Sequence, residues 1–169
     1  MSEPSAQQRQ TLVDRALEIE PRLTRYAARL LGNADAAADV VQEAMLRLLR
    51  CAEPPPEPRL AEWLFTVARN AALDVLRKEG RMKPLSDEHA ERVASTGPSP
   101  QAAAELAEDA GRLVRLMRLL PRGQQDVLRL RFQEQFSYKQ IAGITGLTVT
   151  NVGFMIHTAI KTLRGRMVV

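Results

Sequence analysis

The chain has 169 residues, of which 45% are hydrophobic and 4% aromatic, and it carries a formal net charge of +4. This length suffices for one ordinary domain or two small ones. The single cysteine, Cys51, excludes an internal disulfide framework and a cysteine-based zinc cluster. Because the sequence shows no signal peptide and no long apolar run, we expect a cytoplasmic protein without stable membrane insertion.

Four helices are predicted in the first half of the chain, from apolar residues that recur every three or four positions. They cover residues 7–20, 21–31, 34–50 and 60–78. We expect Pro21 to open the second helix, and Gly32 and Asn33 to end it and to cap the next one. Residues 52–59 contain four prolines and predict a stiff connector without helix. The four helices can enclose one core, so residues 1–81 are predicted to form a helical domain.

The helix predicted over residues 34–50 has a polar face opposite its apolar stripe. This face consists of Asp35, Asp39, Gln42, Glu43 and Leu46. Solvation and the helix dipole alone explain acidic residues near a helix N-terminus. Leu46 is apolar, and its place on this face favours a protein partner.

The helix predicted over residues 60–78 also has two different sides. Its expected buried stripe is Leu64, Val67, Ala68, Ala71 and Val75, continued by Trp63. The opposite side carries Asn70, Asp74, Arg77 and Lys78. This side is either a surface of helix ion pairs or a DNA contact, since asparagine reads base edges and basic groups bind phosphates.

A change of composition separates the first domain from a second one. Residues 82–104 contain three prolines, scattered charge and no sustained period, which is typical of a flexible linker. A second helical domain is predicted over residues 105–169, and it holds ten Lys and Arg against five Asp and Glu. Its first helix is expected to end at Pro121 and to bury the stripe Leu106, Ala110, Leu113, Met117 and Leu120. The basic charge makes this domain the better candidate for binding a polyanion.

The second domain ends in a predicted pair of helices joined by a tight turn at Gly146. Ser137 and Gln140 form a capping box at the start of the first helix, and Thr148 caps the second. Its buried stripe is Val152, Ile156, Ala159, Ile160 and Leu163. This layout places a recognition helix in the DNA major groove, and the alternative is an ordinary hairpin in an all-α core.

The exposed side of the predicted recognition helix has few basic residues. It carries Thr150, Asn151, Phe154, Met155 and Thr158, with Lys161 and Arg164 toward its end. Thr and Asn can hydrogen-bond bases, and apolar groups can meet thymine methyls. We expect phosphate contacts mainly from Lys139, Arg129 and Arg131. Two other roles are open for Phe154 and Met155: their side chains pack either on another protein or on the preceding helix.

Catalysis is the interpretation that the sequence supports least. The two histidines, His89 in the linker and His157 in the second domain, have no carboxylate pair, nucleophile motif or glycine-rich phosphate loop near them. We therefore expect no enzyme activity, no metal and no cofactor, and a structural role for His157.

Three blocks of sequence carry a family resemblance. They are residues 35–48 (DAAADVVQEAMLRL), 63–77 (WLFTVARNAALDVLR) and 120–132 (LPRGQQDVLRLRF). In this order and spacing they resemble the extracytoplasmic-function (ECF) sigma factors, which are initiation subunits of bacterial RNA polymerase. The resemblance implies an all-α protein in which one domain, region two, binds the polymerase clamp and the −10 element. The other domain, region four, binds the polymerase flap and the −35 element.

The resemblance also implies roles for individual residues. The polymerase contact would be Asp35, Asp39, Gln42, Glu43 and Leu46, and the −10 contact Asn70, Asp74, Arg77 and Lys78. The −35 contact would be Ser137, Lys139, Thr150, Asn151, Phe154 and Lys161. The proline-rich connector would capture a base flipped out of the −10 strand, although it has no aromatic residue for stacking.

The expected partners are core RNA polymerase, promoter DNA and an anti-sigma factor. Two alternatives remain at this stage. One is a transcriptional regulator that binds duplex DNA alone through residues 105–169. The other is a sigma mimic that occupies polymerase without reading promoters, which the few basic residues of the recognition helix leave open.

Overall fold

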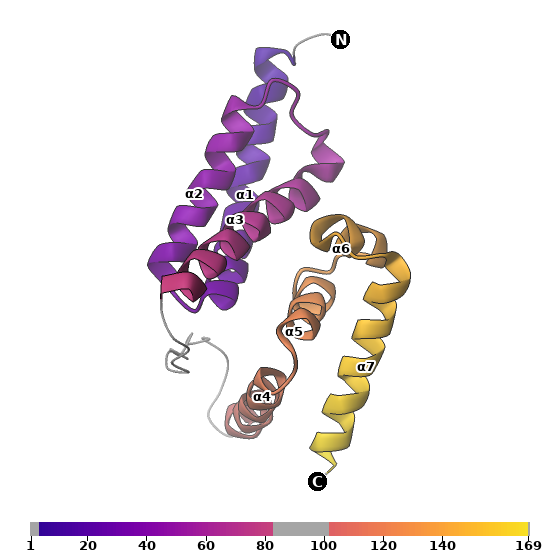
Figure 1. The fold of residues 1–169 in the computed structure, drawn as a ribbon. Helices are drawn as coiled ribbons and strands as arrows, with labels where there is room; N and C mark the ends of the chain where they lie inside the picture. The colour runs from indigo at the N-terminus through magenta and orange to yellow at the C-terminus, as the bar shows by residue number, and fades with distance from the viewer. Residues whose placement is uncertain (1–3, 83–101, 169) are drawn as a thin grey trace. The chain divides into compact units, whose positions relative to one another are not determined.

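The computed structural model describes residues 4–82 and 102–168 (Figure 1). Throughout these ranges the regular structure is helical, and neither range contains a strand. The chain forms two compact units. The N-terminal unit is built on three long helices, and the C-terminal unit on the helices that follow residue 102. The predicted all-α, two-domain fold is confirmed.

The N-terminal unit consists of α1 (Ala6–Leu31), α2 (Ala34–Arg50) and α3 (Leu60–Met82), which pack against one another. α1 begins with a capping box between Ser5 and Gln8 and ends at Gly32, whose φ of 64° requires the left-handed region. The Asn33 side chain then accepts hydrogen bonds from the first N–H groups of α2. The predicted bounds of α2, its cap at Asn33 and the helix end at Gly32 before it are confirmed.

The predicted break at Pro21 is wrong, because Pro21 lies inside α1, a single helix of 26 residues. A proline inside a helix removes one backbone hydrogen bond and costs about 3 kcal/mol relative to alanine. Here the helix on both sides of Pro21 packs against α2 and α3 and buries Ala16, Leu23 and Ala27. Tertiary packing therefore outweighs the local preference of the proline, which itself lies on the exposed side.

The buried side of α3 differs in part from the predicted stripe. Leu64 and Ala68 are buried as expected, but Val67, Ala71, Val75 and Trp63 are only half-buried. The fully buried positions also include Leu60, Phe65 and Ala72. The centre of the Phe65 ring lies 5.1 Å from that of the Tyr26 ring of α1, so this side of α3 faces α1.

The connector between α2 and α3 contains a short 3₁₀ turn, η1 (Glu57–Arg59), so the expectation of no helix is wrong for these three residues. Pro58 is tolerated there because the first turn of a helix has no internal partner for its N–H groups. Pro54 lines a shallow groove with Leu12, Val13, Leu48 and Leu49. The connector is therefore held against α1 and α2.

The C-terminal unit begins with α4 (Ala102–Arg118) and α5 (Arg122–Leu128), followed by the π-helical turn η2 (Arg129–Gln133). The helix-turn-helix is formed by α6 (Tyr138–Thr145) and α7 (Val149–Met167). The capping box of Ser137 and Gln140 is present in both directions, at 2.9 and 3.1 Å. Gly146 has a φ of 75°, and Thr148 caps α7, so the predicted turn is confirmed.

The predicted stripe of α4 is mostly wrong. Ala110 and Leu113 are exposed, Met117 is half-buried, and only Leu120 is buried, while the side chain of Leu106 lies outside the described residues. α4 is instead joined to the end of α7, where Arg112 donates a hydrogen bond of 3.3 Å to the carbonyl oxygen of Met167. Arg112 thereby satisfies a carbonyl at a helix C-terminus, where no internal donor exists.

Candidate nucleic-acid and protein interfaces

The outer face of α2 presents every residue predicted for a protein contact. Asp35, Asp39, Gln42, Glu43 and Leu46 are all exposed. The opposite side of the helix is buried at Ala37, Val40, Val41, Ala44 and Leu48, so this orientation is fixed by the core. Sequence reasoning missed Leu49, which is 55% exposed three residues after the 43% exposed Leu46. Two exposed leucines on one face give this surface an apolar part that contact with a protein would cover.

The outer face of α3 carries the second polar set. Asn70, Asp74, Arg77 and Lys78 are exposed. The Asp74 carboxylate pairs with the Arg77 guanidinium at 3.2 Å, as the spacing predicted. An exposed pair of this kind contributes little to stability, so the residues remain available to a polyanion or to base edges.

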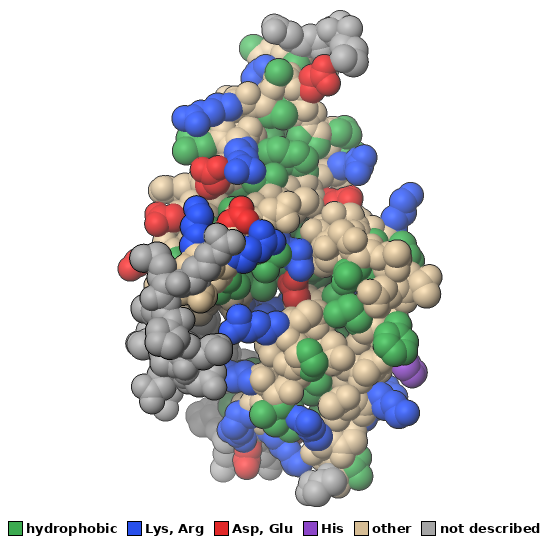
Figure 2. Space-filling view, in the orientation of Figure 1, with side chains coloured by type: hydrophobic (Ala, Val, Ile, Leu, Met, Phe, Trp, Pro, Cys, Tyr) green, Lys and Arg blue, Asp and Glu red, His purple; other side chains and the backbone are tan. Residues whose placement is uncertain are grey.

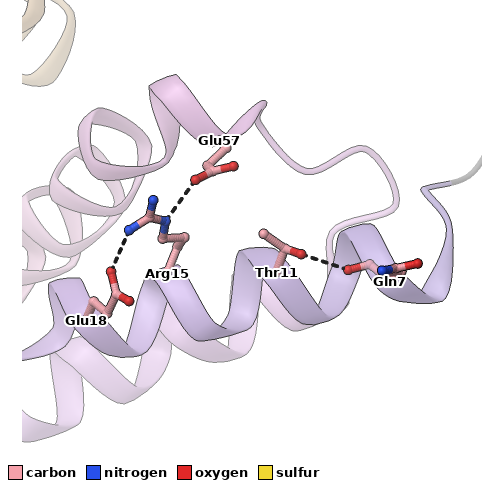
Figure 3. Close-up of polar contacts among 5 residues, drawn as sticks. All are labelled: Gln7, Thr11, Arg15, Glu18 and Glu57. Atoms are coloured by element: carbon pink, nitrogen blue, oxygen red, sulfur yellow. Dashed lines mark hydrogen bonds and ion pairs between the residues drawn. The ribbon is translucent and has the colours of Figure 1, made fainter.

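The connector is tied to α1 by an ion pair that sequence reasoning missed (Figure 3). Arg15 donates from Nε to Glu57 of η1 at 2.8 Å and from Nη1 to Glu18 at 2.8 Å. The hydrogen bonds to Glu18 and Glu57, in that order of strength, raise the pKa of the Arg15 guanidinium above its ordinary range. No sequence signal could reveal this link, because Arg15 and Glu57 lie 42 residues apart.

The recognition helix α7 presents a line of exposed side chains away from its buried stripe. Thr150, Asn151, Phe154, His157 and Lys161 are exposed, and Phe154 reaches 68%. Packing of Phe154 on the preceding helix is therefore wrong. His157 is not a buried structural residue but lies three positions after Phe154 on the same side, a helical spacing that could have revealed it.

Two other positions of α7 face the protein itself. A Cβ atom on Gly153 would stand 3.4 Å from the ring of Tyr138, and the Met155 methyl lies 3.0 Å from where a Cβ atom of Gly123 would be. Met155 thus lies against α5, which is neither of the two predicted arrangements, since the helix that precedes α7 is α6. These two contacts decide which side of α7 is left for a partner.

The basic residues near the turn have different environments. Arg131 donates to the carbonyl oxygen of Phe136 at 3.0 Å, and Arg129 donates to Gln125 at 3.2 Å. Both arginines are half-buried, whereas Lys139 is exposed at the start of α6. Exposed Lys and Arg side chains are frequent on the C-terminal unit (Figure 2). Of Arg129, Arg131 and Lys139, Lys139 is therefore the best placed to bind a DNA phosphate.

Within the described ranges, no group of three His, Cys, Asp or Glu residues could hold a metal ion. None of the helices in these ranges has the length and hydropathy that crossing a bilayer requires.

Comparison with known proteins identifies both units. Residues 17–82 match the family model of Sigma-70 region 2, and residues 110–163 match that of Sigma-70, region 4. The ECF RNA polymerase sigma factor EcfG of Rhodopseudomonas palustris is 33% identical over 150 residues, which cover 88% of this chain and 81% of EcfG. The chain belongs to the ECF sigma factors. It binds core RNA polymerase and directs promoter-specific transcription initiation.

Other relatives of this sigma factor agree with that membership. The ECF sigma factor SigL of Mycobacterium tuberculosis H37Rv is 33% identical over 148 residues, which cover 84% of this chain and 80% of SigL. The sigma factor RpoE of Bartonella quintana, solved in complex with the anti-sigma factor NepR, has a TM-score of 0.64. It is 24% identical, and the match covers 90% of this chain and 94% of that chain, so this likeness shows the fold.

Proposed function

We propose that this sigma factor divides promoter reading between its two units. Residues 1–81 bind core polymerase and the −10 element, residues 105–169 bind the −35 element, and residues 82–104 link them. The observation that carries this proposal is the exposed line of Thr150, Asn151 and Phe154 on a helix-turn-helix whose two helices are both capped at their N-termini. Family membership supplies the context in which such a face meets DNA.

The polymerase contact is the outer face of α2. Its members are Asp35, Asp39, Gln42, Glu43 and Leu46, and they dock on the clamp of the polymerase. The acidic groups favour a basic partner surface, and burial of Leu46 adds about 25 cal/mol for each Å² of apolar surface removed from water. The exposure of all five side chains in the free protein supports this assignment.

The −10 contact is the outer face of α3 together with the connector. Asn70 hydrogen-bonds a base edge, and Arg77 and Lys78 hold phosphates, while Asp74 orients Arg77 through their 3.2 Å ion pair. The connector captures an unstacked base. Its attachment to α1 at Pro54 and Glu57 lowers the ordering entropy that binding would otherwise lose.

The −35 contact combines the start of α6 with the exposed side of α7. Its members are Ser137, Lys139, Thr150, Asn151, Phe154 and Lys161. Asn151 and Thr150 read base edges, and Phe154 meets a thymine methyl. Ser137, Lys139 and Lys161 contact the sugar-phosphate backbone of the DNA. Phosphate contacts position the protein and base contacts specify the sequence, so these residues have separable effects.

The protein acts as a binding subunit rather than as an enzyme, and it works in the cytoplasm, where polymerase and chromosome meet. An anti-sigma factor is a further partner. Support comes from the likeness in fold to RpoE, which was solved with the anti-sigma factor NepR.

Run-off transcription tests the proposal. Core polymerase is supplied with a library of genomic fragments, with and without this protein, and the transcript starts are mapped. Start sites that require the protein and share two sequence elements are expected. Tight binding of one duplex sequence by the protein alone, with no new start sites, would instead support the stand-alone regulator, and binding to core without new start sites would support the sigma mimic.

A further inference from the structure

Tyr138, which none of the proposed contacts includes, connects the two helices of the DNA-binding motif. It is the first residue of α6 and is 38% exposed. Its ring lies over the backbone of α7 at Gly153, where a Cβ atom would stand 3.4 Å from Cε2 and 3.7 Å from Cδ2. A side chain larger than alanine at position 153 would need the space that this ring occupies.

The ring also lies close to a basic group of η2. The guanidinium carbon of Arg131 lies 5.2 Å from the centre of the Tyr138 ring, within the range of a cation–π interaction. Arg131 is itself fixed, because its Nη1 donates to the carbonyl oxygen of Phe136 at 3.0 Å. The Tyr138 ring of α6 thus contacts both Arg131 of η2 and the backbone of α7 at Gly153.

The contact at Gly153 limits the rotation of α7 about its own axis. With Gly153 against the ring, Thr150, Asn151 and Phe154 are among the side chains of α7 that remain exposed. A side-chain tip lies about 6 Å from a helix axis, so a turn of roughly 20° would move it by about 2 Å. That displacement exceeds the whole range of a good hydrogen-bond distance.

We infer that Tyr138 is a positioning residue for base reading: its ring, supported by Arg131, fixes the angle at which α7 presents Thr150, Asn151 and Phe154 to the −35 bases. This inference rests on the proposed function, in which α7 reads those bases. It assigns the role to the ring rather than to the hydroxyl group, because the ring makes both of the contacts described above, with Arg131 and at Gly153.

The test uses the full-length protein with core polymerase on one promoter fragment recovered by the run-off experiment. In a companion set of fragments, each −35 base pair is replaced in turn. The readout is the ratio of transcription from the original fragment to that from each substituted fragment. Tyr138→Ala is expected to reduce the largest of these ratios at least about threefold, while Tyr138→Phe keeps the ring and the ratios.

A matched pair of glycines in α7 provides the control. Gly153→Val places a branched side chain against the ring and is expected to reduce the ratios as Tyr138→Ala does. Gly165→Val makes the same change where nothing lies within 4 Å, and the ratios are expected to stay unchanged. Thermal melting of each variant is followed by circular dichroism, and if Tyr138→Ala does not fold, Gly153→Val and Tyr138→Phe carry the test.

Three results would overturn the inference. One is an equal loss of transcription on every fragment by Tyr138→Ala and Gly153→Val, which indicates a structural role only. Another is an equal effect of Gly153→Val and Gly165→Val, and the third is a loss with Tyr138→Phe as large as with Tyr138→Ala. The proposed function fails separately, if Thr150→Ala and Asn151→Ala change no ratio.

Discussion

The two units bury their apolar residues to different extents. In the N-terminal unit, Leu23, Leu60, Leu64 and Phe65 are at most 1% exposed. In the C-terminal unit, Leu130, Ile141 and Val152 are fully buried as well, but Leu119 at 64%, Phe132 at 60% and Phe154 at 68% are among the apolar residues that stay exposed. Fewer large apolar side chains are exposed over the described residues of the N-terminal unit: Leu17 at 55%, Leu46 at 43% and Leu49 at 55%. Both units therefore enclose a core, and the second leaves more apolar surface outside it that a bound partner would cover. A short helical unit can thus orient a recognition helix by caps and a few contacts, without enclosing all its apolar side chains.

The largest effect is expected on the free energy of unfolding, when a buried leucine of the N-terminal unit is compared with a partly exposed leucine of the C-terminal unit. Leu64→Ala should lower the free energy of unfolding by about 2–5 kcal/mol, because it leaves a cavity at a fully buried position. Leu113→Ala should lower it by clearly less, because Leu113 is 38% exposed and its truncation leaves no enclosed cavity. Urea denaturation followed by circular dichroism measures both. Equal losses would mean that α4 packs against a core after all.

The second prediction concerns the exposed face of α7. Asn151→Ala should cost about 1–3 kcal/mol at one −35 base pair and relax the preference there. Lys139→Ala should weaken transcription similarly on all promoters and lower the salt slope by about one unit, since it removes one phosphate contact. Promoter variants assayed at several salt concentrations distinguish the two effects. A uniform loss for Asn151→Ala would contradict base reading by that residue.

The third prediction concerns the exposed face of α2. Asp39→Ala combined with Gln42→Ala should weaken binding to core polymerase about tenfold, equivalent to about 1.4 kcal/mol. Helix content should stay unchanged because both side chains are exposed. Glu20→Ala, an exposed acidic position on α1, is the control for the change of charge. Unaltered co-purification of the double variant with core would show that the polymerase contact lies elsewhere.

The smallest effect is expected for the ion pair that ties the connector to α1. Arg15→Glu and Glu57→Arg should each lower the melting temperature slightly at low salt. The combined swap should recover the part that the pair with Glu57 contributes, while the loss of the pair with Glu18 remains. The effect should vanish near 1 M salt, where the Debye length falls to about 3 Å, because the pair is exposed. A combined swap that melts no higher than Arg15→Glu alone would show that the contact between the connector and α1 adds nothing to stability.

Local signals in the sequence were sufficient to predict where most helices begin or end. Side chains that cap a helix act within three residues, so the caps at Asn33, Ser137 and Thr148 could be predicted from the sequence alone. The same holds for the turn at Gly146, because a positive φ favours glycine. Pro21 misled the prediction for the opposite reason. Its local preference is clear, but burial of neighbouring turns of α1 against two other helices outweighs it.

The orientation of a helix could be predicted only where its apolar residues are confined to one side. α2 and α7 have narrow stripes, and the orientation of both was predicted correctly, although Ile160 of the predicted stripe and Thr158 of the predicted exposed side are both half-buried. α3 has apolar residues around most of its circumference, so the choice between Val67 and Phe65 depended on the distant Tyr26 ring. The contacts of Met155 and Gly153 likewise depend on residues of other helices, which no periodicity records.

The half-buried side chain of Trp63 has a practical consequence for studying this protein. It is the single tryptophan of the chain, and it lies on α3. Indole emission therefore reports on the N-terminal unit alone, whereas far-ultraviolet circular dichroism averages over the helices of both units. Recording the two signals in one denaturation experiment would show whether the units unfold together. If the curves separate, they give the stability of each half of the intact chain, with no added label and no truncation.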